Sequence, residues 1–199
     1  MDTKQKIFEA AVRFFARKGY NGTSMRDLSK EVGIKESTLY YHFENKAAIL
    51  DAILQFYIEG FGASLPTPDE MELMAKRFTD PVQLWLNGAR DFYSKQPELL
   101  PLVAGILLNE MFLNEKCREF VLHTMFKIQK ESTEFLIRDM VERGLIKNCD
   151  IKKTAAQYVY MLHGLDIENR LQLQEGKSKE DVFRHIFENI TFFIENLIK

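Results

Sequence analysis

Near the start of the chain, apolar residues recur every three or four positions, which is the spacing of one helix face. The pattern predicts an amphipathic helix over about residues 3–18, ending at Gly19 after the basic pair Arg17–Lys18. The apolar positions are Ile7, Ala10, Ala11, Phe14 and Phe15.

Two much shorter helical segments follow. Ser24 with Asp27 three residues later is a capping-box pattern, so we expect a helix to begin there and to end at Gly33. Residues 35–41 have room for only about two helical turns. Asn45 then caps a longer helix, whose pattern weakens after Phe56 and which we expect to give way to a linker over residues 63–68.

Beyond this linker the apolar spacing is helical throughout, and no segment has the alternation of a strand. Gly (10) and Pro (5) are scarce, which also favours helices. The chain is therefore predicted to be all-α, with about nine to ten helices. The later helices are expected over about residues 69–77, 80–94, 97–113, 115–143, 150–174 and 178–197.

Composition places the chain among ordinary folded proteins. Its 199 residues include 46% apolar and 28% charged residues, and two cysteines are too few for a disulfide scaffold. Residues 1–20 carry charges every few positions, unlike a signal peptide, and no apolar run approaches a membrane span of roughly 20 residues. We therefore expect a cytoplasmic protein without membrane contact.

The net charge of −2 is unevenly distributed. Residues 1–50 contain nine Lys/Arg and six Asp/Glu, a balance of +3, whereas the remainder carries −5. A basic head on an acidic body is typical of a polyanion-binding module joined to another domain, although chance alone can produce so small a difference.

A long helix followed by two short helices around a Gly turn is the pattern of a helix-turn-helix module. In such a module the second short helix enters the DNA major groove, which admits one helix. Ile34, Leu39 and Phe43 supply the inward anchor here, and the residues between them supply donors, acceptors and rings on the remaining faces.

Residues 1–50 resemble the DNA-binding domain of the tetracycline-repressor (TetR) family of bacterial transcription regulators. The resemblance implies a homodimer, operator DNA as partner, and release from DNA by an effector bound in a helical body. It divides the chain into a DNA-binding domain, residues 1–48, and an effector-binding and dimerisation domain, residues 49–199. The matching positions include Gly19-Tyr20, Thr23-Ser24-Met25-Arg26-Asp27-Leu28, Val32-Gly33-Ile34, Ser37-Thr38-Leu39-Tyr40-Tyr41-His42-Phe43 and Asn45-Lys46.

The resemblance also implies roles for particular residues. Ser24 and Arg26, with Thr23 close by, would contact DNA from the second helix, and Lys46 would hold a phosphate. Residues of the third helix would contact phosphates or base edges (Thr38, Tyr40, Tyr41, His42) or tune the operator sequence (Lys35, Glu36, Ser37).

Three of these positions have an alternative role. Glu36 either accepts a hydrogen bond from a cytosine amino group or is a solvated acid at a helix start. Lys46 is otherwise a surface lysine after the Asn45 cap, and Tyr41 is otherwise part of the core.

Aromatic and methionine side chains of the body suit an apolar cavity for a small apolar or aromatic effector. The candidates are Trp85, Phe92, Tyr93, Met111, Met125, Ile128, Tyr158, Met161 and His163. For each of these residues singly, ordinary bundle packing is the favoured explanation. Glu110, His123 and His163 lie in apolar stretches, where each either orients a ligand, faces solvent or satisfies a backbone group.

The last two helices are predicted to form the homodimer interface, because residues 150–174 are apolar on nearly every side. A buried helix of a monomer would share this pattern. The candidate interface residues are Ala155, Val159, Leu162, Ile167, Phe183, Phe187 and Ile190.

The four histidines have no metal-ligand spacing, and no phosphate loop or nucleophile elbow occurs, so we expect no enzyme activity, metal or cofactor. Two functional hypotheses remain. The first is a ligand-responsive repressor that binds operator DNA as a homodimer. The second is a helix-turn-helix adaptor that acts mainly through protein partners.

Overall fold

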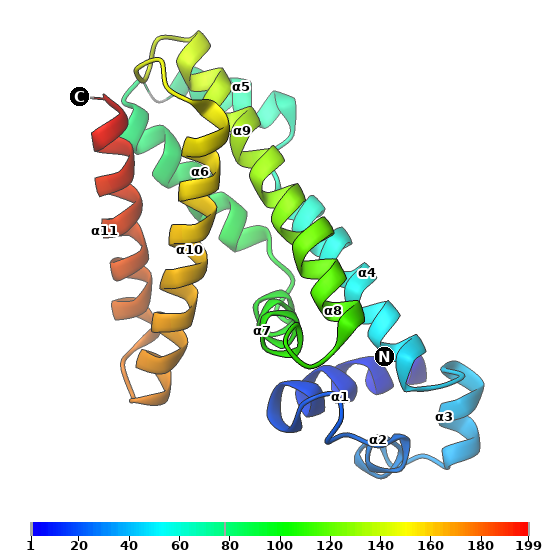
Figure 1. Ribbon diagram of the computed structural model, residues 1–199. Helices are drawn as coiled ribbons and strands as arrows, with labels where there is room; N and C mark the ends of the chain where they lie inside the picture. The colour runs from blue at the N-terminus through cyan, green and yellow to red at the C-terminus, as the bar shows by residue number, and fades with distance from the viewer. Residues whose placement is uncertain (1, 78, 199) are drawn as a thin grey trace. The chain divides into compact units, whose positions relative to one another are not determined.

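The computed structural model describes residues 2–77 and 79–198, and over these residues it consists of helices and their connections, without strands (Figure 1). The all-α prediction is confirmed. The helices are α1 (Thr3–Lys18), α2 (Met25–Val32), α3 (Glu36–His42), α4 (Lys46–Ser64), α5 (Pro68–Arg77), α6 (Pro81–Lys95), α7 (Leu100–Glu110), α8 (Glu115–Phe120), the π-helical turn η1 (Val121–Met125), α9 (Phe126–Glu142), α10 (Ile151–Gln174) and α11 (Lys179–Ile198).

Local signals fix the ends of the first helices as the sequence predicted. The Asp27 N–H donates to Ser24 Oγ and the Ser24 N–H donates to Asp27 Oδ2, both at 3.1 Å, which completes a capping box on α2. Gly33 ends α2 in the left-handed conformation, with φ +72°. The Ala48 N–H donates to Asn45 Oδ1 at 2.9 Å and so caps α4.

Two helices differ from the expected pattern. α4 does not weaken after Phe56 but continues to Ser64, because one face of its second half is buried and Gly60 allows close approach of the Pro97 and Leu100 side chains. The helix expected over residues 115–143 is instead three consecutive segments, in which the turn η1 has π-helical hydrogen bonding.

The chain forms two compact units. The first combines the chain up to Ser64 with Lys95–Met125, and the second combines Leu65–Ser94 with the chain from Phe126 onward. The chain therefore passes from one unit to the other three times. This division by compactness differs from the division by function at residues 48 and 49, which stays a prediction.

In the first unit, α1 packs against α2, α4 and α7, and α4 packs against α7. The core of this unit includes several side chains without exposed surface: Ile7, Ala11, Leu28, Leu39, Ile49 and Ile53. Leu39 is the buried residue of α3, so this one side chain anchors the two-turn helix to its neighbours.

In the second unit, α10 packs against α9 and α11, and the core is centred on Trp85 of α6. Trp85 Nε1–H donates to the Tyr158 hydroxyl at 2.9 Å, and the two rings meet edge to face with centroids 5.1 Å apart. Across the described residues, no single helix is both long and apolar enough to cross a membrane.

Candidate nucleic-acid interface

Helix α3 turns one side chain into the core and most of the others outward. Leu39 has no exposed surface, whereas Tyr40 is 49% and Tyr41 85% exposed. Glu36 and Ser37 are exposed as well, and Lys35 is exposed at the N-cap position. The alternative that Tyr41 belongs to the core is therefore wrong.

The other two predicted residues of α3, Thr38 and His42, are half-buried at its edges. The His42 ring meets the Tyr41 ring edge to face, with centroids 5.2 Å apart. The exposed face of α3 thus presents carboxylate, hydroxyl and aromatic groups together, over a helix short enough to fit one major groove.

Helix α2 contributes its first turn to the same surface. Arg26 is exposed, and its Nε lies 3.9 Å from Glu36 Oε1 across the boundary between α2 and α3. Glu36 therefore has a third role that the sequence did not suggest. Both side chains are more than half exposed, so the pair contributes only about 0–1 kcal/mol and can separate at low cost.

Of the three remaining predicted residues, Thr23 and Ser24 lie in the turn between α1 and α2, and Ser24 is exposed at the N-cap of α2. Thr23 is 2% exposed, and its hydroxyl donates to the Gly19 carbonyl at 2.9 Å. Its predicted place beside DNA is therefore corrected: Thr23 closes the turn from inside.

Lys46, the first residue of α4, is engaged by the protein itself. Its Nζ donates to the Tyr20 carbonyl at 2.7 Å and to the Thr23 carbonyl at 2.9 Å, and it lies 4.3 Å from the centroid of the Tyr20 ring. Desolvation in this position lowers the pKa of the Lys46 ammonium. Two of its three N–H donors are thus committed to the turn.

The residues predicted to line an effector pocket lie in both compact units, and the pocket stays a prediction. Met111 and Met125 belong to the first unit, whereas the other seven residues of the set lie in the second. Trp85 and Tyr158 form the hydrogen-bonded pair in the core, and burial raises the pKa of Tyr158. Met161 packs against that core, and Ile128 is half-buried on α9.

The other candidate pocket residues, Phe92, Tyr93 and His163, also contact neighbouring side chains. The Phe92 and Tyr93 rings meet with centroids 5.6 Å apart, and desolvation raises the pKa of Tyr93 to about 12. His163 Nε2 lies 2.7 Å from Gln129 Oε1, and burial lowers the pKa of the imidazole.

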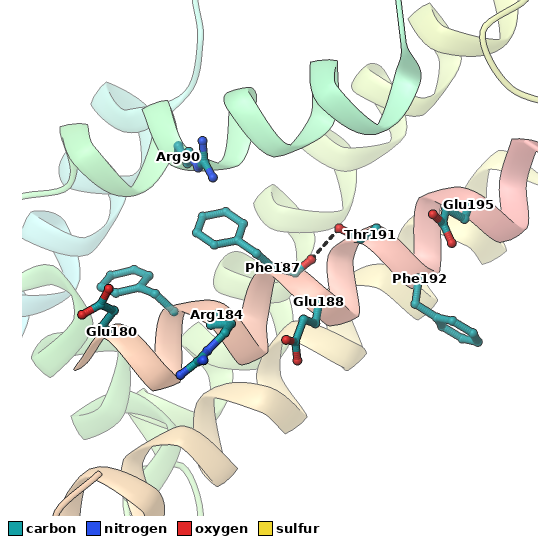
Figure 2. Close-up of a pocket in the computed structure, with 9 residues that line it drawn as sticks. Arg90, Glu180, Arg184, Phe187, Glu188, Thr191, Phe192 and Glu195 are labelled. Atoms are coloured by element: carbon teal, nitrogen blue, oxygen red, sulfur yellow. Dashed lines mark hydrogen bonds between the residues drawn. The ribbon is translucent and has the colours of Figure 1, made fainter. Parts of the chain in front are cut away.

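A shallow groove of about 560 Å³ lies instead between α6 and α11 (Figure 2). Arg90 of α6 lies over the Phe187 ring, 5.2 Å from its centroid. Phe183 and Phe187 line this groove, and both belong to the predicted dimer interface. Phe192, which is 69% exposed, lines it as well and was not predicted. A second, smaller hollow of about 280 Å³ lies between α5 and α6, and neither hollow contains a residue predicted to line the effector pocket.

The rest of the predicted dimer interface divides by burial. Ile167 is 58% exposed and Leu162 is partly buried against the core. Ala155 and Ile190 have no exposed surface and Val159 has 3%, so the structure corrects the prediction for these three residues. These three side chains pack inside their own chain, so they have almost no exposed surface that a partner could contact.

Taken together, the fold and the outward face of α3 define a helix-turn-helix protein with a second, all-helical unit. Residues 7–53 match the family of bacterial regulatory proteins known as the tetR family. The match covers about a quarter of the chain, and over these residues the chain is similar to the TetR family.

Relatives and solved structures are similar to this chain over different lengths. The IcaR protein of Staphylococcus epidermidis, described as the negative transcriptional regulator of the biofilm operon icaADBC, is 50% identical over 46 residues, which are 23% of this chain and 25% of IcaR. The chain thus matches only a quarter of that relative's length.

The structural similarities extend over nearly the whole chain. A TetR-family protein from Rhodococcus sp. has a TM-score of 0.70 at 19% identity and covers 100% of both chains. A protein from Saccharomonospora viridis, described as a transcriptional regulator and solved in complex with choline, has a TM-score of 0.66 at 24% identity, covering 98% of this chain and 97% of that one. At these identities the likeness establishes the fold.

Proposed function

We propose that the protein is a transcriptional regulator that reads operator DNA with α3. The observation that carries this proposal is the division of α3 into one buried anchor, Leu39, and an outward face with Tyr40 and Tyr41. The apolar ring surface of an exposed tyrosine is removed from water when another molecule covers it. A DNA duplex can do this, because it offers base edges to the rings and phosphates to the hydroxyls.

Helix α2 supports α3 in this role. Ser24 and Arg26 at its start lie toward the backbone of the same groove, and Lys35 lies at the start of α3. Ser37, Thr38 and His42 complete the contact surface. Glu36 leaves its pair with Arg26 or keeps it according to the base that it meets, which makes it a determinant of operator sequence.

The test is selection of bound fragments from genomic DNA, followed by fluorescence anisotropy with the best fragment. Tyr41→Ala and Tyr40→Ala are expected to weaken binding by roughly 5- to 150-fold each, the equivalent of about 1–3 kcal/mol per specific contact. Leu73→Ala is the control, because Leu73 is 67% exposed on α5 and lies outside both this surface and the α10–α11 surface proposed below.

If the variants bind as well as the parent, the reading face is wrong. If no fragment is enriched at low salt, the protein does not read DNA, and a stable protein complex would then favour the adaptor function.

We propose further that the protein acts as a homodimer whose subunits meet through the exposed faces of α10 and α11. Ile167 and Leu171 on α10, and Phe183 and Phe192 on α11, are each at least 45% exposed. Apolar surface of this extent marks interaction sites. A dimer also places two copies of α3 in successive major grooves, about 34–36 Å apart.

Sedimentation equilibrium tests the interface. Phe183→Asp and Phe192→Asp are expected to yield monomers, whereas Leu73→Asp, a control on α5 at a residue that is 67% exposed, should leave the dimer intact. A monomeric parent, or dimers of all three variants, would overturn this interface.

The regulator is proposed to repress transcription and to be released by a small effector held by the second unit. Repression is supported by the likeness of the N-terminal region to a negative regulator, and a small ligand by the choline bound to one structural neighbour. An apolar or aromatic effector would have to open the packed ring cluster around Trp85, which a ligand screen by tryptophan fluorescence can detect. A protein that acts on operator DNA would work in the cytoplasm.

A further inference from the structure

The turn that joins α1 to α2 is held by two charged side chains from other helices. On one side Glu110, the last residue of α7, accepts the Tyr20 N–H with its Oε1 at 2.7 Å. On the other side Lys46 donates to the Tyr20 carbonyl at 2.7 Å. The backbone of one residue, Tyr20, is therefore fixed at its donor by an anion and at its acceptor by a cation.

The fit of the carboxylate to the turn is close. Gly19 has φ +75°, and a Cβ atom built on it would lie 3.0 Å from Glu110 Oε1. A side chain at Gly19 would be strained by this φ, and its Cβ would crowd the Glu110 carboxylate. Glu110 is 5% exposed, and its second oxygen, Oε2, is buried without a hydrogen-bond partner among the described residues.

An orphaned buried carboxylate oxygen lowers stability, because its desolvation is not offset by a hydrogen bond. Glu110 is thus a poor choice for stability alone at this site. We therefore attribute its presence to the position in which it holds the turn. The positive charge of Lys46 on the far side of Tyr20 offsets part of the desolvation cost of the Glu110 carboxylate.

What the turn positions is the start of α2. Lys46 donates at 2.9 Å to the carbonyl of Thr23, the residue immediately before the Ser24 cap. Helix α2 in turn packs against α3, which carries the exposed tyrosines. A displacement of the turn would therefore move α2 and α3 together relative to α4 and α7.

We infer that Glu110 and Lys46 are positioning residues for DNA reading: they hold the α1–α2 turn from opposite sides and so orient α2 and α3, without contacting DNA. This inference rests on the proposed DNA-binding function. It replaces the predicted role of Lys46, which was to hold a phosphate, and it gives Glu110 a role in DNA binding that its negative charge alone would oppose.

The sign of the Glu110 effect separates positioning from electrostatics. Removing a negative charge near DNA would by itself strengthen binding to the polyanion. Glu110→Gln is instead expected to weaken binding by roughly five- to fiftyfold, because the neutral amide oxygen of Gln accepts the Tyr20 N–H less strongly than the carboxylate does. Glu115→Gln, the same charge change at an exposed residue of α8, should leave binding unchanged or slightly tighter.

The dependence on salt separates positioning from phosphate contact. A lysine that neutralises a phosphate contributes about 0.9 to the slope of log K against log[salt]. Lys35→Met on the exposed start of α3 is expected to lower that slope. Lys46→Met is expected to weaken binding but keep the parent slope, and to combine with Glu110→Gln less than additively, since both act on one turn.

The experiment measures anisotropy of the selected DNA fragment against salt for the parent and these variants, with circular dichroism to confirm folding. Hydrogen exchange of the Tyr20 amide, followed by NMR without DNA, is expected to accelerate in Glu110→Gln and not in Glu115→Gln. Tighter binding by Glu110→Gln, a lower salt slope for Lys46→Met, or unchanged Tyr20 exchange overturns the inference.

The outcome is distinct from failure of the proposed function. If the parent binds no DNA, the function fails, while the Tyr20 exchange still reports whether Glu110 holds the turn. If Tyr41→Ala weakens binding and Glu110→Gln does not, the function stands and this inference falls.

Discussion

The hydrogen bond between Trp85 and Tyr158 allows a quantitative test of the second unit. Tyr158→Phe removes only the hydroxyl that accepts the Trp85 N–H at 2.9 Å, and the edge-to-face ring contact can remain. Trp85 is 6% and Tyr158 7% exposed, so the indole N–H is left buried without an acceptor. An unsatisfied buried donor costs about 1–3 kcal/mol, so the free energy of unfolding should fall by that amount.

The assay uses the fact that Trp85 is the one tryptophan of the chain, so its fluorescence reports unfolding of this unit alone. At about 2–4 °C per kcal/mol for a chain of this size, the melting temperature should drop by about 2–12 °C. Tyr160→Phe, at a residue that is 54% exposed, is the control and should stay within about 0.5 kcal/mol of the parent. Equal stability of the two variants would refute the reasoning, since it would mean that the hydrogen bond contributes nothing.

Three further predictions concern single residues. Ser24→Ala should cost about 0.5–2 kcal/mol of unfolding free energy in urea denaturation, since it removes the cap of α2. Hydrogen bonds from Ser24 lower the pKa of Asp27, so their stabilisation is present above the ordinary value of 3.8 and is lost as the pH falls through the lower folded pKa. The stabilities of parent and Ser24→Ala should therefore converge in acid, and curves that stay parallel down to unfolding would contradict this account. Gly33→Ala should cost about 1 kcal/mol by thermal melting, from backbone strain at φ +72° alone, because no atom lies within 4 Å of the added Cβ; a loss several times larger would indicate a clash instead. Iodoacetamide at pH 8 should modify Cys149 well before Cys117, which is buried and whose pKa burial raises to about 11; equal rates by intact-mass spectrometry would show that the α8 region opens freely.

The sequence predicted features that depend on neighbours along the chain. The capping box of Ser24 and Asp27, the left-handed Gly33 and the Asn45 cap involve residues at most three positions apart. The burial of Leu39 next to the exposed Tyr40 follows from helical spacing in the same way. The placement of the exposed face of α3 could therefore be predicted.

Features that depend on distant partners could not be predicted. Gly60 is typical of a helix end by itself, and only the approach of Pro97 and Leu100 explains why α4 continues past it. Lys46 finds its acceptors 23 and 26 residues away, so its spacing gives no sign of them. Ala155 and Ile190 are buried within their own chain. An apolar residue type in the sequence does not show whether the side chain is buried inside its own chain or against a partner subunit.

The threefold passage of the chain between its two units has a practical consequence for protein engineering. For the function proposed above, a chimera would fuse the proposed DNA-reading head of one protein to the sensor of another at a single junction. In this protein a junction at residue 48 would separate the head from Lys95–Met125, and with it from α7, whose last residue holds the Tyr20 backbone. A transplantable head therefore consists of two pieces of sequence, and a successful graft must carry both.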